Sequence, residues 1–318
     1  MKGEASDDLV RLSGEIIQAG SKSFAAAARL FDPSTRASAY LLYAWCRHCD
    51  DAIDGQELGI GKLPGRHDAL AHDPVGELAR LRKLTGDALD GKSMSDPIFA
   101  AFQRVSRKHS IPRRHPLELL AGFAMDVDGR RYETIEDTLD YCYHVAGVVG
   151  VMMSIIMGAR DEDTLDRACD LGLAFQLTNI VRDIVDDAGA GRLYLPRQWL
   201  HEAEVPLDGI AKPEHRTAIF ALARRLLDIA DDYYRSSSDG VARLTLRSAW
   251  SVSTARIVYR EIGEEVRRRG PAAWDSRVST SKTQKVAAVM RGAQTAISSR
   301  FSVDNAPRRD ELWTRPKG

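Results

Sequence analysis

Neither sign of charge is in excess in this sequence. The 318 residues contain 45 Lys and Arg against 45 Asp and Glu, which gives a formal net charge of zero. Nucleic-acid-binding proteins normally carry a basic surplus or a basic stripe. The short arginine runs at 113–114 and 267–269 are better interpreted as solvated helix faces. The charge balance therefore argues against a nucleic acid as the partner.

Cysteines are few and long apolar runs are missing. The four cysteines lie in apolar, helix-like stretches, and Cys46 and Cys49 form a lone CxxC pair without the second pair that a zinc site needs. We expect free thiols and a cytoplasmic protein. The longest apolar run, residues 146–159, is shorter than the roughly 20 residues that cross a bilayer. We expect a buried helix there and no membrane-spanning segment.

Alternating strand patterns and fixed-period repeats are also missing. The glycines at 59 and 61 lack the strand and helix that flank a dinucleotide-binding loop, and residues 55–73 have loop composition. The pattern predicts a single all-α bundle over residues 1–301 with a site in its core, followed by a flexible polar tail over 302–318. Apolar residues recur at helical spacing over 7–19, 33–54, 74–91, 96–109, 115–128, 136–157, 162–187, 214–236, 239–269 and 279–300.

A first pair of aspartates stands out within these helices. Asp50 and Asp54 follow Tyr43 and Arg47, and a turn of 100° per residue places all four within a stripe about 60° wide. Carboxylates in apolar helices are costly to bury without a partner. A solvated acidic face, with Arg47 paired to Asp51, is the alternative interpretation.

A second pair, Asp183 and Asp187, repeats the same spacing. With Gln176 and Asn179 it spans about 80° of a helix, and Arg182 flanks that stripe. One such pair alone is usually solvated. Two pairs, each with a polar partner on the same face, predict one oxygen-rich metal site between facing helices.

The residue types in this predicted site indicate its chemistry. Oxygen ligands select hard cations such as Mg²⁺ or Mn²⁺, and Mg²⁺ often completes its coordination with substrate phosphates. Arginines bind diphosphates through forked hydrogen bonds. Arg47, Arg182, Arg192 and Lys22 are the candidates, although Arg192 also fits an ordinary loop arginine and the tyrosines fit packing roles.

Five segments of the chain resemble the squalene/phytoene synthase family, and within it the bacterial phytoene synthases. The similarity implies an isoprenoid synthase bundle with a central apolar cavity, for which residues 25–28 and 148–157 are candidate lining. Between them the segments contain the glycine–serine–lysine–serine sequence, both aspartate motifs and the tyrosine-rich stretch that starts at Tyr141. They are residues 20–24, 42–54, 141–150, 171–196 and 246–259.

The resemblance also implies a reaction. Two geranylgeranyl diphosphates would be condensed head to head to phytoene via prephytoene diphosphate, with release of two diphosphates, in carotenoid biosynthesis. The enzyme would need Mg²⁺ or Mn²⁺ but no NADPH, and it would contact membranes peripherally and other carotenoid-pathway enzymes. A squalene or dehydrosqualene synthase that uses farnesyl diphosphate is one alternative. A non-catalytic helical lipid-binding or assembly protein is another.

The family pattern assigns roles to particular residues. Tyr141 resembles a family tyrosine that assists proton removal or stabilises a cation, and Tyr43 and Arg47 join it and the aspartates in the catalytic set. The implied metal ligands are Asp50, Asp54, Asn179, Asp183 and Asp187. The implied substrate-binding residues are Gly20, Ser21, Lys22, Ser23, Tyr43, Arg47, Gln176, Arg182, Arg192 and Tyr259.

Overall fold

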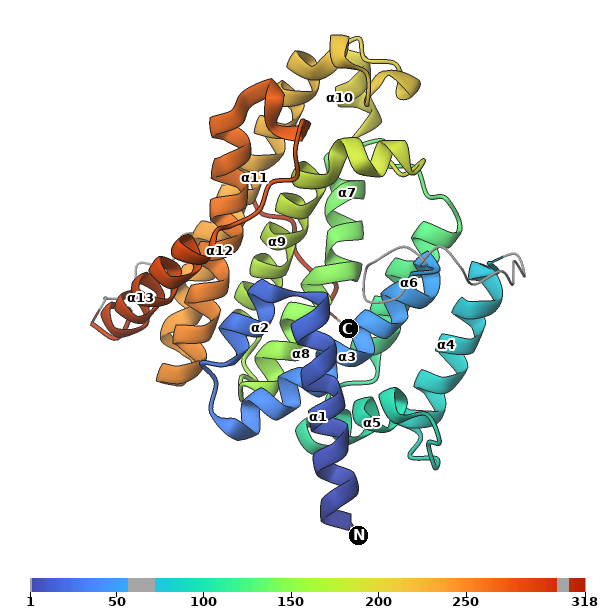
Figure 1. The fold of residues 1–318 in the computed structure, drawn as a ribbon, viewed down its shortest axis with the longest axis vertical. Coiled ribbons are helices and arrows are strands. Elements are labelled where there is room, and N and C mark those ends of the chain that lie inside the picture. The colour runs from blue at the N-terminus through green and yellow to red at the C-terminus, as the bar shows by residue number, and fades with distance from the viewer. Residues whose placement is uncertain (1, 57–71, 302–308, 318) are drawn as a thin grey trace.

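The computed structural model describes residues 2–56, 72–301 and 309–317, and every regular element within these residues is helical (Figure 1). The all-α prediction is confirmed. Most helices lie within a few residues of their predicted ends. The exceptions are α2 (Lys22–Ala28) and α10 (Arg197–Glu202), which the periodicity missed, and the break between α11 (Arg216–Ala242) and α12 (Leu246–Arg269), which comes later than expected.

Helix α3 (Pro33–Asp54) carries the first aspartate pair, and its ends are set by local sequence. The Asp32 carboxylate caps its start by accepting the backbone N–H of Ser34 at 3.0 Å, with proline in the first turn. Gly55 ends it at a φ of 63°, a left-handed conformation that favours glycine. Trp45, which has no exposed surface, stacks on Phe102 with ring centroids 4.2 Å apart and anchors the helix.

Neighbouring helices surround α3. Helix α1 (Lys2–Gly20) and α2 lie together in front of it in Figure 1, whereas α4 (Pro74–Leu89), α5 (Pro97–His109) and α6 (Arg114–Val127) cover its other side. The hydroxyl of Ser21 caps α2 by accepting the backbone N–H of Phe24 at 3.2 Å. This capped turn brings the glycine–serine–lysine–serine segment over α3.

A continuous helical stretch from Ile135 to Ile156 crosses the core. It consists of α7 (Ile135–Cys142), a π-helical turn over Tyr143–Gly147 and α8 (Val148–Ile156). Its length and composition would suffice to cross a membrane, which the apolar run in the sequence did not predict. However, 61% of its most apolar window is buried, and it packs on α6 and α9. We therefore interpret it as the expected buried helix, extended at its start.

Helix α9 (Glu162–Gly189) carries the second aspartate pair and lies at the centre of the bundle, against α8, α11 and α12. Two glycines permit its close contact with the helical stretch 135–156. A Cβ at Gly150 would lie 2.3 Å from the carbonyl oxygen of Ala168, and one at Gly172 would lie 2.4 Å from that of Ala146. Any larger side chain would force the second aspartate helix away from Tyr141.

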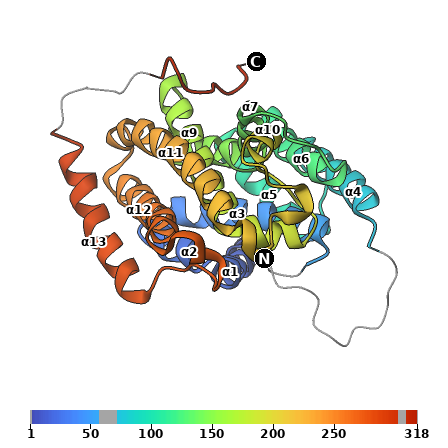
Figure 2. The same cartoon turned by 90° about the horizontal axis from the view of Figure 1, so that it is seen from above.

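The last described residues, 309–317, form a docked segment, whereas the sequence predicted a flexible tail over 302–318. Leu312 and Trp313 pack against the main core, and the Arg315 side chain has no exposed surface. Figure 2 shows this segment beyond α9, on the side away from α1 and α2. The prediction is wrong for residues 309–317, because these side chains pair with acidic residues far away in sequence. Residues 302–308 lie outside the described part of the chain.

Candidate active site

The first aspartate pair lies beside Arg47 on α3. One Arg47 nitrogen lies 3.1 Å from Asp50 Oδ2, and the other lies 2.7 Å from Asp51 Oδ1. The predicted stripe is therefore present, and so is the alternative pairing with Asp51. Burial raises the pKa of Asp50 to about 7; Arg47 opposes this rise and repulsion from Asp54 adds to it. The charge of Arg47 is therefore too weak to keep the pKa of this carboxylate in its usual range.

Asp54 connects α3 to the segment that follows α9. Arg192 donates two hydrogen bonds to its carboxylate, at 3.2 and 2.5 Å, across 138 residues of sequence. These bonds hold the pKa of Arg192 above its usual range. The structure thus brings Arg192 to the first aspartate pair, as expected of a residue that binds diphosphate beside these carboxylates. Arg192 lies in a loop, but its contact with Asp54 distinguishes it from an ordinary loop arginine.

The second aspartate pair has the same shortage of positive partners. The Arg182 guanidinium donates to both oxygens of Asp183, one of them at 2.8 Å. Burial raises the pKa of Asp187 to about 7, and repulsion from Asp183 is the next largest cause. The Asn179 side-chain nitrogen lies 3.4 Å from the Gln176 oxygen, whereas the buried Asn179 Oδ1 has no hydrogen-bond partner. An oxygen that is buried without a partner is suited to a cation.

Four aromatic rings join the helices that carry the site. Tyr259 on α12 stacks on Phe175 of α9 at 4.3 Å and contacts Phe24 of α2 at 5.2 Å, and Phe24 in turn lies 6.3 Å from Tyr43 of α3. Burial raises the pKa of Tyr259 to about 12, and a hydrogen bond with Ser21 opposes the rise. Tyr43 and Tyr259 are thus packing residues whose hydroxyls also lie close to charged groups.

The glycine–serine–lysine–serine segment is only partly brought to this region. A Cβ at Gly20 would lie 2.7 Å from the Tyr43 hydroxyl oxygen, so glycine permits α1 to approach that side chain. Ser21 and the half-buried Ser23 lie at the start of α2. Lys22 is exposed, and its charge contributes to the lowered pKa of Lys285, which burial causes first. Lys22 therefore lies near α13 (Lys282–Ser298) rather than in contact with the aspartates.

Tyr141 contacts a residue that the sequence analysis did not select. Its hydroxyl donates to Asp126 Oδ2 of α6 at 3.1 Å, and the Tyr194 hydroxyl donates to Asp126 Oδ1 at 3.0 Å. The two phenol rings stack with centroids 4.7 Å apart, and Tyr132 packs on both. Asp126 has no second acid four residues away in its amphipathic helix, so its spacing gave no signal. The π-helical turn that begins at Tyr143, two residues after Tyr141, was also missed, and such turns are frequent at functional sites.

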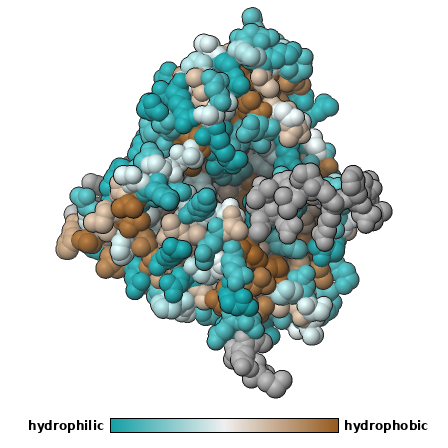
Figure 3. All heavy atoms as spheres, viewed as in Figure 1, coloured by the Kyte–Doolittle hydropathy of each residue, from teal (hydrophilic) through white to brown (hydrophobic). Residues whose placement is uncertain are grey.

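The donor set fits a hard divalent cation, although the described residues contain no group of three His, Cys, Asp or Glu side chains close enough to hold one ion. Burial, with like-charge repulsion added, raises the pKa values of Asp50 and Asp187, and the buried Asn179 Oδ1 has no hydrogen-bond partner, so a bound cation would be favourable for all three groups. Mg²⁺ commonly takes only one or two protein carboxylates and completes its coordination with phosphates and water. The ligand set therefore remains a prediction, and so does the central apolar cavity. The face of the molecule in Figure 3 is hollowed near its middle, in the region that α2 and α9 border in Figure 1.

Comparison of the sequence with known proteins identifies its relatives. A sequence model of the squalene/phytoene synthase family matches residues 17–284. The 15-cis-phytoene synthase of Enterobacter agglomerans is 52% identical over 301 residues, covering 94% of this chain and 100% of the relative. The phytoene synthase of Pseudescherichia vulneris is 53% identical over 93% of this chain and 94% of its own length.

Comparison of structures gives the same fold. A crystal structure of a dehydrosqualene synthase superposes with a TM-score of 0.81 at 27% identity, over 93% of this chain and 99% of that one. The squalene synthase HpnC from Alicyclobacillus acidocaldarius has a TM-score of 0.72 at 23% identity, over 83% of this chain and 95% of its own. The predicted isoprenoid synthase architecture is confirmed.

Proposed function

Because this chain belongs to the squalene/phytoene synthase family, we propose that it joins two geranylgeranyl diphosphates head to head and releases phytoene and two diphosphates. The observation that carries this proposal is a sequence identity of 52–53% to phytoene synthases over nearly the whole chain. The paired aspartates with their arginines provide the matching chemistry. The activity is that of a prenyltransferase in carotenoid biosynthesis.

We propose that three arginines receive the diphosphate groups. Arg47, Arg182 and Arg192 now bind Asp50, Asp183 and Asp54. A guanidinium binds a phosphate with the same fork that it offers a carboxylate. We propose that the substrates' diphosphates share these arginines, with Tyr43, Gln176, Tyr259 and the segment 20–23 around them.

The residues that would hold Mg²⁺ or Mn²⁺ are Asp50, Asp54, Asn179, Asp183 and Asp187, as the resemblance implies. The bound cations would supply positive charge to the leaving diphosphate. The chain itself contributes the shielding of the allylic cation from water. The buried Ala25 and Ala28 of α2 and the partly buried Met153 of α8 pack in one apolar cluster with Phe24 and Tyr43, and we propose that they help to exclude solvent there.

A sister reaction is the second candidate function. The dehydrosqualene synthase that superposes at 27% identity favours the shorter farnesyl diphosphate as a substrate to test. The test is incubation of the purified protein with either diphosphate and Mg²⁺, followed by mass analysis of the extracted hydrocarbon. We expect phytoene from geranylgeranyl diphosphate, none with EDTA, and no change with NADPH. A C30 hydrocarbon alone would favour the sister reaction, and no hydrocarbon would favour a non-catalytic relative.

We also propose that the enzyme works in the cytoplasm and contacts an anionic membrane surface transiently through α13. The exposed apolar residues of this helix, Val286, Met290 and Ile297, share one face and are 54–67% exposed. Brown side chains gather over α13 at the lower left of Figure 3. Residues 276–301 contain five basic residues and no acidic one, which suits lipid headgroups of negative charge. Contact with other carotenoid-pathway enzymes stays a prediction.

A matched pair of variants tests this membrane face. Val286 on α13 and Val75 on α4 are both 65% exposed. We expect Val286→Glu to lower cosedimentation with vesicles of mixed anionic and zwitterionic lipid several-fold, and Val75→Glu to leave it unchanged. Equal binding by all three proteins would contradict the proposal, as would self-association through α13 without vesicles.

A further inference from the structure

Asp126 and the two tyrosines that bind it form a cluster at the edge of the candidate site, hereafter the Asp126 cluster. Tyr141 comes from α7 and Tyr194 from the segment after α9, while Asp126 lies near the end of α6. The backbone carbonyl of Tyr194 accepts a hydrogen bond from the Thr138 hydroxyl at 2.9 Å, which ties that segment to α7. Three separate elements are therefore held together around one carboxylate.

The charges around Asp126 connect it to the aspartate–arginine site. Burial raises the pKa of Asp126 to about 6; the hydrogen bonds from Tyr194 and Tyr141 and the charge of Arg192 oppose this rise, and Asp54 adds to it. Asp126 in turn contributes to the raised pKa of Asp50. The carboxyl is thus mostly ionised at neutral pH and lies within electrostatic range of residues proposed to bind diphosphate.

The direction of the hydrogen bonds has a chemical consequence. An ionised carboxylate can only accept, so both phenols must donate their hydrogens to Asp126. The lone pairs of the Tyr141 oxygen are then left for a group other than Asp126. Burial also raises the pKa of Tyr141 well above its usual range, so this phenol does not ionise at neutral pH. A neutral phenol is a weak base unless its own proton can move onward at the same time.

We propose that Asp126 is the proton acceptor of the condensation and acts through Tyr141; this inference rests on the proposed function. In the first half-reaction a C–H bond beside the carbocation breaks, and its electron pair closes the cyclopropane ring. The proton goes to Tyr141 Oη while the phenolic hydrogen moves to Asp126 Oδ2. The cation's charge and that of Asp126 cancel, and Tyr141 is neutral before and after. Between turnovers the carboxyl passes its proton to water.

Tyr194 is the positioning residue of this relay. Its hydroxyl occupies the second carboxylate oxygen, which leaves Oδ2 for Tyr141, and it favours the ionised form of Asp126. Tyr132 packs on both phenol rings, but its hydroxyl has no hydrogen bond to Asp126 among the described contacts. Tyr132 is therefore a matched control, since Tyr132→Phe removes a hydroxyl from the same aromatic group and leaves the relay intact.

The experiment measures kcat against pH at saturating Mg²⁺ and geranylgeranyl diphosphate. We expect Asp126→Asn to lower kcat by about 100-fold or more, with KM nearly unchanged, because an amide cannot take up the proton. Asp126→Glu should recover part of this loss. Tyr194→Phe should move the acidic limb of the profile to higher pH, whereas Tyr132→Phe should leave it where it is in the wild type.

Two results would overturn the relay. One is kcat for a folded Asp126→Asn variant within about twofold of wild type, since a general base contributes much more than this. The other is an acidic limb that does not move in Tyr194→Phe, a measurement that stands even if Asp126→Asn fails to fold. If the wild-type protein makes no phytoene, the proposed function itself has failed. If the wild type makes phytoene and these variants match it, only the relay is wrong.

Discussion

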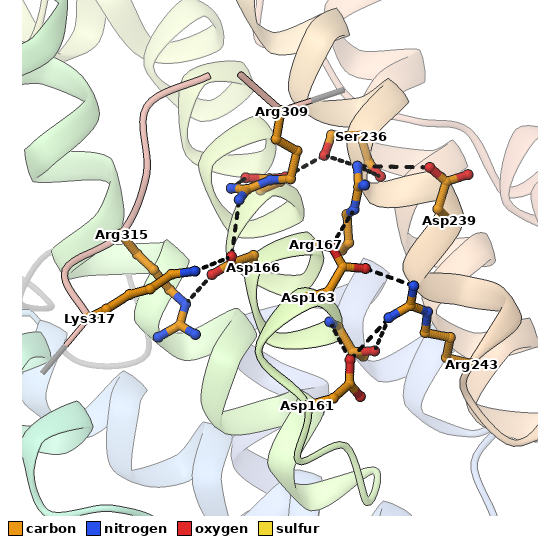
Figure 4. Close-up of polar contacts among 12 residues, drawn as sticks. Asp161, Asp163, Asp166, Arg167, Ser236, Asp239, Arg243, Arg309, Arg315 and Lys317 are labelled. Carbon is orange, nitrogen blue, oxygen red and sulfur yellow. Dashed lines mark hydrogen bonds and ion pairs between the residues drawn. The ribbon is translucent and has the colours of Figure 1, made fainter. Parts of the chain in front are cut away.

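The two halves of α9 each carry a pair of aspartates four residues apart, and the two pairs differ in the number of positive side chains that bind them. In the first half, Arg309 donates two hydrogen bonds of 2.7 Å to Asp170. Arg315 and Lys317 bind Asp166 at 2.7 and 2.9 Å (Figure 4). In the second half, Arg192 and Arg182 are the positive groups that oppose the raised pKa of Asp187, and both also bind other aspartates, Asp54 and Asp183. We infer that the pair with more positive partners stabilises the fold and that the other pair serves the proposed ligand.

The first half of α9 is also more completely buried. Asp170 has no exposed surface, and burial raises its pKa although Arg309 and Ser236 oppose the rise. Asp183 remains 22% exposed. Like-charge repulsion in the second half persists until a cation or an additional positive group arrives. This difference predicts that equivalent substitutions will affect activity at one end of α9 and stability at the other.

The largest effect is expected from Asp183→Asn. The amide keeps the shape but removes a charge from the proposed ligand set, so turnover should fall by about 1,000-fold, or about 4 kcal/mol of transition-state stabilisation. The melting temperature of the metal-free protein should fall less than that of Asp170→Asn, because relief of the repulsion with Asp187 offsets part of the lost contact with Arg182. Product formation and circular dichroism check the two expectations. Near-normal turnover by the folded variant would remove Asp183 from the site.

Asp170→Asn should show the opposite behaviour. The change removes one of the two carboxylates that pair with Arg309, since Asp166 also lies 3.1 Å from it, and breaking one side of a buried pair costs at most about 3–5 kcal/mol. Urea unfolding should show this loss, while kcat per folded molecule stays within about twofold. If Asp170→Asn instead lowers kcat strongly at full stability, the comparison between the halves is wrong.

A double variant sharpens this second prediction. Asp170→Asn combined with Arg309→Met removes both charges, so the loss of stability should be smaller than the sum of the two single losses by about 1–3 kcal/mol. The same urea measurement gives this coupling energy. Additive losses would mean that the Asp170–Arg309 contact does not hold residues 309–317 against α9.

The smallest effect is a dependence of stability on pH. The folded pKa of Asp50 and of Asp187 is about 7, against about 3.9 in an unfolded chain. Between these values the folded protein binds more protons, so its free energy of unfolding in EDTA should decrease as pH rises from about 4 to about 7. Asp50 is 44% exposed, and screening limits the effect to about 1 kcal/mol. Asp187→Asn should flatten this decline, and an unchanged slope would contradict the raised pKa of Asp187.

Spacing alone predicted much of the fold and part of the site. Helical periodicity and capping residues such as Asp32 are local signals, and they placed α3 and α9 with the correct faces. The same spacing rule cannot separate Asp183 and Asp187 from Asp166 and Asp170. What separates them is a set of cations from residues 309–317, and no local pattern shows that these residues reach α9.

Other parts of the site depended on tertiary contacts in the same way. Asp126 gains its importance from two tyrosines on different elements, and Arg192 from its contact with Asp54 across the bundle. The π-helical turn at 143–147 also arises where α9 packs closely on this stretch. The family resemblance selected Arg192 and Tyr141 but gave no indication of Asp126.

The most direct test of the difference between the two halves of α9 measures Mn²⁺ binding in the presence of inorganic diphosphate. Binding is monitored as the loss of the free Mn²⁺ signal in electron paramagnetic resonance. The matched pair is Asp183→Asn at one end of α9 and Asp163→Asn, whose carboxylate pairs with Arg243 at 2.8 Å, at the other. We predict that Asp163→Asn binds like the wild type and that Asp183→Asn loses at least about tenfold in affinity. Wild-type affinity in Asp183→Asn would contradict the claim that the underpaired aspartates of α9 hold the metal.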